Sequence, residues 1–326
     1  MSVLEVRNLQ THFFTDAGVV KAVDGVDFSL SEGEVLGLVG ESGSGKSVTG
    51  FSILRLVDPP GRVVGGHILY KGQDLAQLPE AEMRRLRGNR IAMIFQDPMM
   101  TLNPVLRIDT QMIEAVRAHE KVSAKAARDR AIGALAKVGI PSPAERLNAY
   151  PHQFSGGMRQ RVAIAIALLN GPDVIVADEP TTALDVTIQS QILAEVQELA
   201  RDTGTALIWI THDLAVVAGL ADRVAVMYAG RIVETGDTNT VLKAPAHPYS
   251  VGLLGSIPGH GHRGQRLAQI PGMAPNMARL PQGCAFAPRC FRAEADCRAA
   301  APGITEIAPG RELRCHHSLL EQEPTA

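Results

Sequence analysis

Short, continuous apolar runs recur along the first ~235 residues and alternate with stretches that have helical spacing. Such a run, bounded by polar residues, is typical of a strand that is buried on both faces. The alternation of strands and helices predicts an α/β layer architecture. We expect buried strands at residues 35–39, 91–95, 174–177, 207–210 and 224–227.

Two stretches depart from this pattern. Residues ~109–150 are rich in Ala, Arg, Lys and Glu at helical spacing, which predicts a helical insertion in the α/β core. From residue ~237 onward, prolines and glycines interrupt any long helix. The composition of this last part predicts a separate, loop-rich tail.

The composition excludes several classes of protein. The chain has 326 residues, of which 45% are hydrophobic and 20% charged, values close to those of an average globular protein. Its net charge of −2 argues against a broad nucleic-acid-binding surface. No apolar run approaches the ~18–20 residues of a membrane span, and the N-terminus lacks the layout of a signal peptide. We therefore expect neither an integral membrane protein nor a secreted one, although docking onto a membrane protein stays open.

The four cysteines are confined to the tail, at Cys284, Cys290, Cys297 and Cys315. In a chain without an export signal, such a cluster favours a metal site over disulfides. The spacing contains no pair separated by the two to four residues usual in structural zinc sites. Four thiolates from a loop-rich segment also suit a [4Fe–4S] cluster. Zinc, with His316 or His317 as a further ligand, and free or paired thiols are the alternatives.

A phosphate-binding pattern follows the first predicted strand. Residues 40–47 match the P-loop, in which glycines let backbone N–H groups surround phosphate oxygens. Lys46 is expected to contact the β- and γ-phosphates of a nucleotide, and the Ser47 hydroxyl to bind Mg²⁺. The predicted nucleotide-binding residues are Gly40, Glu41, Ser42, Gly43, Ser44, Gly45, Lys46, Ser47 and Val48.

Two carboxylates end the predicted strand at residues 174–177. A buried strand presents its last side chains at the carboxyl edge of the sheet, where α/β proteins bind ligands. Asp178 is therefore expected to bind Mg²⁺, directly or through water, and Glu179 to act as a general base on the attacking water. An acidic strand end alone is weak evidence for a catalytic site. The P-loop in the same chain makes this interpretation much stronger.

A serine and two glycines precede another helical stretch. Ser155 is expected to cap the helix, and Gly156 and Gly157 to leave backbone N–H groups accessible to a second anion. An ordinary capped helix would show the same local pattern.

Together these motifs resemble the ATPase subunits of ABC transporters. Residues 155–160 are similar to the family's signature motif, Leu-Ser-Gly-Gly-Gln, with Phe154 in place of leucine and Met158 in place of glutamine. Met158 is familiar among peptide importers. The resemblance covers residues ~1–236.

Further positions match the family's motifs in the family's order. The resemblance implies that Gln96 touches Mg²⁺ and couples to the membrane domain, and that Asp185 belongs to the D-loop. It also implies that His212 contacts the γ-phosphate as the switch histidine. Phe13 is the expected adenine-stacking aromatic, with its two neighbours His12 and Phe14 as alternatives.

The family's architecture is a RecA-like P-loop ATPase core with an antiparallel β-subdomain and an inserted helical subdomain. By this resemblance we expect the core at residues 1–96 and 166–236, the helical subdomain at 97–165, and a small, loop-rich, metal-binding extension at 237–326.

The resemblance also implies a dimer of ATPase subunits. Each P-loop would be completed by the partner's counterpart of Ser155, Gly156 and Gly157, with Asp185 nearby and ATP between the two. A triphosphate carries more charge than one loop neutralises, so a second helix N-terminus stabilises the closed state. The expected partners are a second ATPase, commonly a paralogue in peptide importers, and two integral membrane permease subunits.

Residues 96–104, 247–250, 270–272 and 283–290 resemble dipeptide and oligopeptide importer ATPases, which are known to carry a [4Fe–4S] cluster. Nickel and glutathione importers share the pattern. We expect an ATPase at the cytoplasmic face of the membrane that drives peptide uptake, with an extracytoplasmic solute-binding protein in the complex and no nucleic-acid partner. The rival hypotheses are a non-transport ABC ATPase and a metal-dependent sensor.

Overall fold

The structure is a computed structural model that describes residues 2–181, 186–256 and 269–320. Its strands are β1 (Ser2–Thr15), β2 (Gly18–Ser31), β3 (Val35–Val39), β4 (Gly61–Tyr70), β5 (Gln73–Asp74), β6 (Ile91–Ile94), β7 (Val174–Asp178), β8 (Ala206–Thr211), β9 (Arg223–Tyr228), β10 (Arg231–Asp237), β11 (Thr305–Ala308) and β12 (Arg311–Leu313). Its helices are α1 (Lys46–Ile53), α2 (Glu80–Leu86), α3 (Ile108–Arg117), α4 (Ala124–Lys137), α5 (Pro143–Arg146), α6 (Gly156–Leu168), α7 (Val186–Thr203), α8 (Leu214–Leu220), α9 (Thr238–Lys243), α10 (Pro248–Gly255) and α11 (Ala295–Ala299).

Internal contacts divide the chain into two compact units. The first unit contains Met1–Leu4, Leu30–Glu34 and Gln77–Trp209, and the second contains Glu5–Ser29, Val35–Ala76 and Ile210–Ala326. This division follows contacts within the chain, whereas the predicted domains follow the family resemblance, so those boundaries stay predictions.

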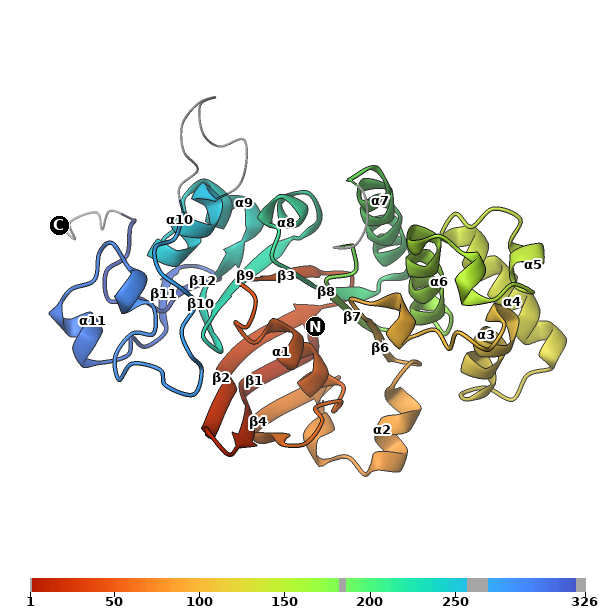
Figure 1. Cartoon of the computed structure of the whole chain (residues 1–326), viewed down its shortest axis with the longest axis horizontal. Coiled ribbons are helices and arrows are strands. Elements are labelled where there is room, and N and C mark those ends of the chain that lie inside the picture. The colour runs from red at the N-terminus through yellow and green to blue at the C-terminus, as the bar shows by residue number, and fades with distance from the viewer. Residues whose placement is uncertain (1, 182–185, 257–268, 321–326) are drawn as a thin grey trace. The chain divides into compact units, whose positions relative to one another are not determined.

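The first unit contains parallel strands and a group of helices that lies between β6 and β7 in the sequence. Strands β8, β7 and β6 are neighbours in that order, and β6 pairs with β7 from Ile91↔Val174 to Ile94↔Ala177. The predicted helical stretch at residues ~109–150 forms α3, α4 and α5, which lie beside α6 (Figure 1). The buried Asp109 of α3 accepts a hydrogen bond from Arg128 of α4 at 2.9 Å, which joins these two helices.

The second unit contains two sheets. One has the strand order β2-β1-β4-β5, and β4 pairs antiparallel with β5. The other joins β11, β12, β10, β9 and β3 in that order, with β3 and β9 parallel and the remaining pairs antiparallel. All residues of β3 are buried, as its continuous apolar sequence predicts. The five predicted buried strands are confirmed as β3, β6, β7, β8 and β9.

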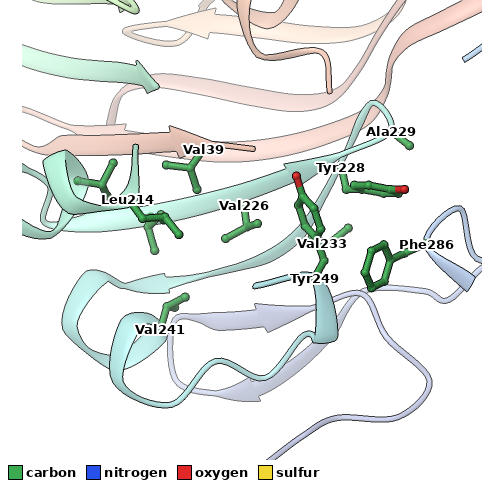
Figure 2. Packing of buried hydrophobic residues seen from close by; sticks show 11 residues of the cluster. Val39, Leu214, Val226, Tyr228, Ala229, Val233, Val241, Tyr249 and Phe286 are labelled. Atoms are coloured by element: carbon green, nitrogen blue, oxygen red, sulfur yellow. The ribbon is translucent and has the colours of Figure 1, made fainter. Parts of the chain in front are cut away.

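The tail is not the separate appendage that its composition predicts. Strand β12 pairs with β10 through Glu234↔Leu313 and Thr235↔Glu312, so the tail extends a sheet that begins at the P-loop strand. Tyr249 and Phe286 pack with residues of β9 and β10 in one apolar cluster (Figure 2). The prediction was wrong because pairing and packing between distant segments leave no local signal in a proline-rich sequence.

None of the described helices has the length and apolar character needed to cross a membrane.

Candidate functional site

The P-loop lies between the carboxyl end of β3 and the start of α1. Its glycines adopt left-handed backbone conformations, with φ of 155° at Gly40, 78° at Gly43 and 107° at Gly45. A Cβ at Gly40 would lie 2.2 Å from the carbonyl oxygen of Met227, and one at Gly45 would lie 2.2 Å from that of Ala22. Because both obstacles are backbone atoms, the loop adopts this conformation only with glycine at these positions.

Lys46 is the first residue of α1, and only 5% of it is exposed. Its Nζ donates hydrogen bonds to the carbonyl oxygens of Gly40 at 2.8 Å and Glu41 at 3.0 Å. The ammonium is therefore held against the loop, next to the positive end of the helix dipole. A buried cation, a glycine-rich loop and a helix N-terminus together form a site suited to a polyphosphate.

Two carboxylates lie at the carboxyl end of β7. Asp178, its last residue, is 5% exposed. Glu179 follows with φ of 44°, a conformation that costs a residue with a side chain about 1–3 kcal/mol and is enriched at functional sites. The Nε2 of Gln96 donates a hydrogen bond to the Glu179 carboxylate at 3.3 Å. The structure thus brings Gln96 and Glu179 together, and the amide orients the carboxylate.

Ser155 caps α6, as predicted. Its Oγ accepts a hydrogen bond from the backbone N–H of Met158 at 3.3 Å. Ser155 and Gly156 are exposed, and a Cβ at Gly156 would meet no atom within 4 Å. Phe154, which replaces the family's leucine, is 4% exposed and anchors the turn before the helix. The N-terminus of α6 is therefore accessible to an anion from outside the chain.

His212 and Asp185 are two further predicted nucleotide contacts. His212 is exposed and follows β8 directly. Asp185 lies outside the residues that the structure describes. Their roles stay predictions.

The predicted adenine-binding aromatic lies on β1. Phe13 is half-buried and packs against Gly61, where a Cβ would lie 2.5 Å from the ring. Phe14 is 40% exposed, and the guanidinium of Arg62 lies 4.4 Å from its ring centroid. The choice of Phe13 therefore stays a prediction.

The four cysteines line one cavity, although they are unevenly spaced along the sequence. Burial raises the pKa of Cys284 and Cys290, and it raises that of Cys315 to about 11. Neighbouring thiols raise these pKa values further, because two nearby thiolates repel each other. The cysteines that line the cavity together are Cys284, Cys290, Cys297 and Cys315, and none of them forms a disulfide.

This set of donors fits a metal bound by thiolates. Backbone N–H groups of Arg292 and His317 each donate to a cysteine sulfur, that of Cys290 and that of Cys315, both at 3.4 Å. A bound cation would remove the mutual repulsion of the thiolates and favour their charged form.

A second group of donors shares Cys297 and His317 with this cavity. Asp296, Cys297 and His317 each place one ligand atom within 4.8 Å of the other two. These three residues lie close enough together to bind a single metal ion such as zinc.

Comparisons with known proteins identify the class. The family model for ABC transporters matches residues 23–182, and that for the C-terminal region of oligopeptide/dipeptide transporters matches residues 233–297. The dipeptide transport ATP-binding protein DppD of Escherichia coli is 48% identical over 319 residues, 98% of both chains. The oligopeptide transport ATP-binding protein OppD of Bacillus subtilis is 54% identical over 257 residues, 78% of this chain and 72% of the relative.

Solved structures show the same fold. A dimeric structure of the bacterial ABC transporter cassette MJ0796 covers 72% of this chain and 98% of its own, with a TM-score of 0.66 and 27% identity. A structure of that cassette after hydrolysis contains ADP and Pi, with a TM-score of 0.65, 26% identity and coverage of 72% of this chain and 98% of that one. The protein is therefore an ABC-type ATPase with the ABC cassette fold. It belongs to the family of ATP-binding subunits of dipeptide and oligopeptide ABC transporters.

Two residues of the tail contact the P-loop, and their sequence context does not predict this. Tyr249 accepts a hydrogen bond from the backbone N–H of Glu41, 208 positions away, and Arg289 forms an ion pair with the Glu41 side chain, 248 positions away. The only local feature that draws attention to Arg289 is its position directly before Cys290, one of the predicted metal ligands.

Proposed function

We propose that this chain is the ATP-hydrolysing subunit of an importer of dipeptides or oligopeptides. The observation that supports this most strongly is the 48% identity with the dipeptide transport protein DppD over 98% of both chains, which includes the tail. Nickel and glutathione importers share the sequence pattern and are the alternative substrates. A non-transport ABC ATPase is less favoured because the family model for the C-terminal region of peptide transporters also matches.

In the proposed reaction, the P-loop holds the triphosphate and water attacks the γ-phosphate. Lys46 neutralises phosphate charge, and Ser47, Gln96 and Asp178 would hold Mg²⁺, which supplies further positive charge. Glu179 accepts the proton of the attacking water, and the hydrogen bond from Gln96 supports its orientation.

We assign His212 to the γ-phosphate and Phe13 to the adenine. An exposed imidazole directly after a sheet strand can reach a ligand at the sheet edge. These assignments follow the family motifs.

A second ATPase subunit, a paralogue in this proposal, completes the site. The exposed start of α6, with Ser155, Gly156 and Gly157, would contact ATP held by the partner's P-loop, and Asp185 would lie at the same interface. Hydrolysis of ATP to ADP and phosphate breaks the bond between the β- and γ-phosphates, so one molecule no longer bridges the two subunits and they separate.

Two integral membrane permease subunits would convert that separation into transport. Met100 is 67% exposed and Val105 is 75% exposed, a few residues after Gln96. Exposed apolar side chains that close to a nucleotide contact favour a protein partner at this place. The chain would then lie at the cytoplasmic face of the membrane as a peripheral subunit, and an extracytoplasmic solute-binding protein would deliver the substrate to the complex.

We propose that the four cysteines hold a [4Fe–4S] cluster with a structural role. Their convergence on one cavity supports a metal site, and the lack of a cysteine pair at the sequence spacing usual in structural zinc sites favours a cluster over a single zinc ion. Zinc bound by Asp296, Cys297 and His317 is the alternative.

Co-purification from native membranes tests the proposed function. We expect two permease subunits and a second ATPase with this chain, and ATP hydrolysis that increases when a peptide-loaded binding protein is added to the reconstituted complex. Stimulation by nickel or glutathione instead of peptides would reassign the substrate. Co-purification with DNA or ribosomes, without permeases, would refute transport.

A further inference from the structure

The tail reaches the nucleotide site through an ion pair between Arg289 and Glu41 of the P-loop. The two terminal guanidinium nitrogens of Arg289 donate to the two carboxylate oxygens of Glu41, at 2.6 Å and 2.9 Å. This two-point geometry is the strongest arrangement of such a pair. The Arg289 side chain is only 7% exposed, and the Glu41 carboxylate raises the pKa of the guanidinium.

The Arg289 side chain is fixed in position by other contacts. Its Nε donates to the carbonyl oxygen of Pro271 at 2.9 Å, and a terminal nitrogen donates to the hydroxyl of Tyr228 at 3.4 Å. The guanidinium also lies 5.8 Å from the ring centroid of Tyr228. Since these contacts exist before a nucleotide arrives, Arg289 needs little reordering to hold Glu41.

A second contact holds the backbone of the same P-loop residue. The N–H of Glu41 donates to the hydroxyl of Tyr249 at 2.8 Å. Tyr249 is fully buried, and its ring lies 4.6 Å from that of Tyr228 and 5.4 Å from that of Phe286 (Figure 2). The tail thus holds both the side chain and the backbone of Glu41.

The charge of Glu41 makes this contact important. A carboxylate in a loop that binds a triphosphate repels the ligand, and the repulsion is stronger near a protein surface than in bulk water. Lys46 donates a hydrogen bond to the backbone carbonyl oxygen of Glu41, so the loop's main cation is bonded to the backbone of this same residue. Arg289 supplies the positive charge that cancels it.

We propose that Arg289 is a positioning residue of the ATP site, which neutralises Glu41 and, with Tyr249, fixes the first turn of the P-loop. The tail is thereby part of the nucleotide-binding apparatus. This inference rests on the proposed binding of ATP at the P-loop.

The test is the dissociation constant of ATP, measured by calorimetry on the full chain. We expect Arg289→Ala to weaken binding about tenfold, because it leaves an uncompensated carboxylate beside the phosphates. Arg298→Ala, which removes an exposed arginine of the same tail, should leave binding unchanged. The defect of Arg289→Ala should shrink in high salt, which screens the lone carboxylate but does not restore a lost packing contact.

A second substitution, which neutralises Glu41, separates the electrostatic effect from a folding defect. Glu41→Gln in the Arg289→Ala background should return the affinity to within about twofold of the wild type, because the repulsive charge is gone. If the alanine variant does not fold, Arg289→Gln keeps most of the side-chain volume and takes its place with the same expectation.

Two results would overturn the proposal: wild-type affinity in Arg289→Ala, or a double variant that binds no better than Arg289→Ala. If the wild-type chain itself binds no ATP, the proposed function and this inference both fail. If it binds ATP and only the Arg289 variants behave otherwise than expected, this inference alone fails.

Discussion

Replacing Arg311 with alanine should destabilise the protein strongly, because it removes the partner of a buried carboxylate. Glu234 on β10 is completely buried, and its carboxylate accepts a hydrogen bond from the Arg311 guanidinium at 2.7 Å. The same carboxylate accepts hydrogen bonds from the backbone N–H groups of Ala246 at 2.9 Å and His247 at 3.0 Å. Arg311 also donates to the carbonyl of Ala244. One ion pair therefore joins β10, β12 and the segment that leads into α10.

The magnitude follows from what the substitution leaves behind. Arg311 is 7% exposed, so its removal leaves a charge in the protein interior with two remaining backbone donors. Breaking a buried pair in this way costs about 3–5 kcal/mol, whereas replacing both partners by well-packed apolar residues is often neutral. We expect Arg311→Ala to lower the free energy of unfolding by that amount. Glu234→Gln combined with Arg311→Met removes both charges and keeps an acceptor for a backbone N–H group, and it should recover much of the loss.

Urea unfolding followed by circular dichroism measures the effect. The exposed Arg298 provides a matched control, and its replacement by alanine should change stability by less than about 0.5 kcal/mol. A loss below about 1 kcal/mol in Arg311→Ala, the range of a surface pair, would refute the reasoning that Glu234 depends on its partner.

Further predictions concern the nucleotide site, the tail and the thiols. Lys46→Ala should weaken ATP binding at least about tenfold in calorimetry, because a charge-assisted contact is lost; unchanged binding would remove the P-loop assignment. Glu179→Gln should keep ATP bound but slow hydrolysis about a hundredfold or more in a phosphate-release assay, and a mild effect would point to another base. Burial lowers the pKa of His247 from 6.5 to about 4, so below pH 6.5 the unfolded chain takes up a proton that the folded chain does not. As the pH falls from 6.5 to about 4, this group should lower the free energy of unfolding by about 1.4 kcal/mol per pH unit. His247→Asn, which keeps an acceptor for the N–H of Tyr249, should show a shallower decline in urea midpoints over this range, and an equal slope would contradict the assignment. Protein purified without oxygen should be brown and contain about four irons per chain, whereas colourless protein with one zinc would establish the alternative.

Most local features of the fold follow from the sequence because they depend on neighbouring residues. The strand at 35–39 is continuous and apolar, and it forms as predicted because both of its faces are buried. The glycines at positions 40 and 45 are required by backbone atoms that would collide with any side chain. Ser155 caps its helix with the hydrogen bond expected of a serine before two glycines.

Long-range features could not be predicted in the same way. The sequence of the tail predicts loops because its prolines break helices. Its short strand β12 nevertheless pairs with β10, and Arg311 of β12 contacts Glu234 of β10, which lies 77 positions earlier. The contacts of Arg289 and Tyr249 with Glu41 depend on chain folding over more than 200 positions, as the separations of 248 and 208 show. Strand β1 is not among the strands that the apolar runs predict, because its buried positions do not alternate regularly.

Peptide accumulation by proteoliposomes that carry the purified transport complex tests the central claim most directly. A labelled peptide and its binding protein are supplied on one side, and either ATP or a non-cleavable analogue on the side of the ATPase subunits. If this chain converts ATP cleavage into import, peptide accumulates against its gradient with ATP and not with the analogue. Equal accumulation with both nucleotides would contradict the account.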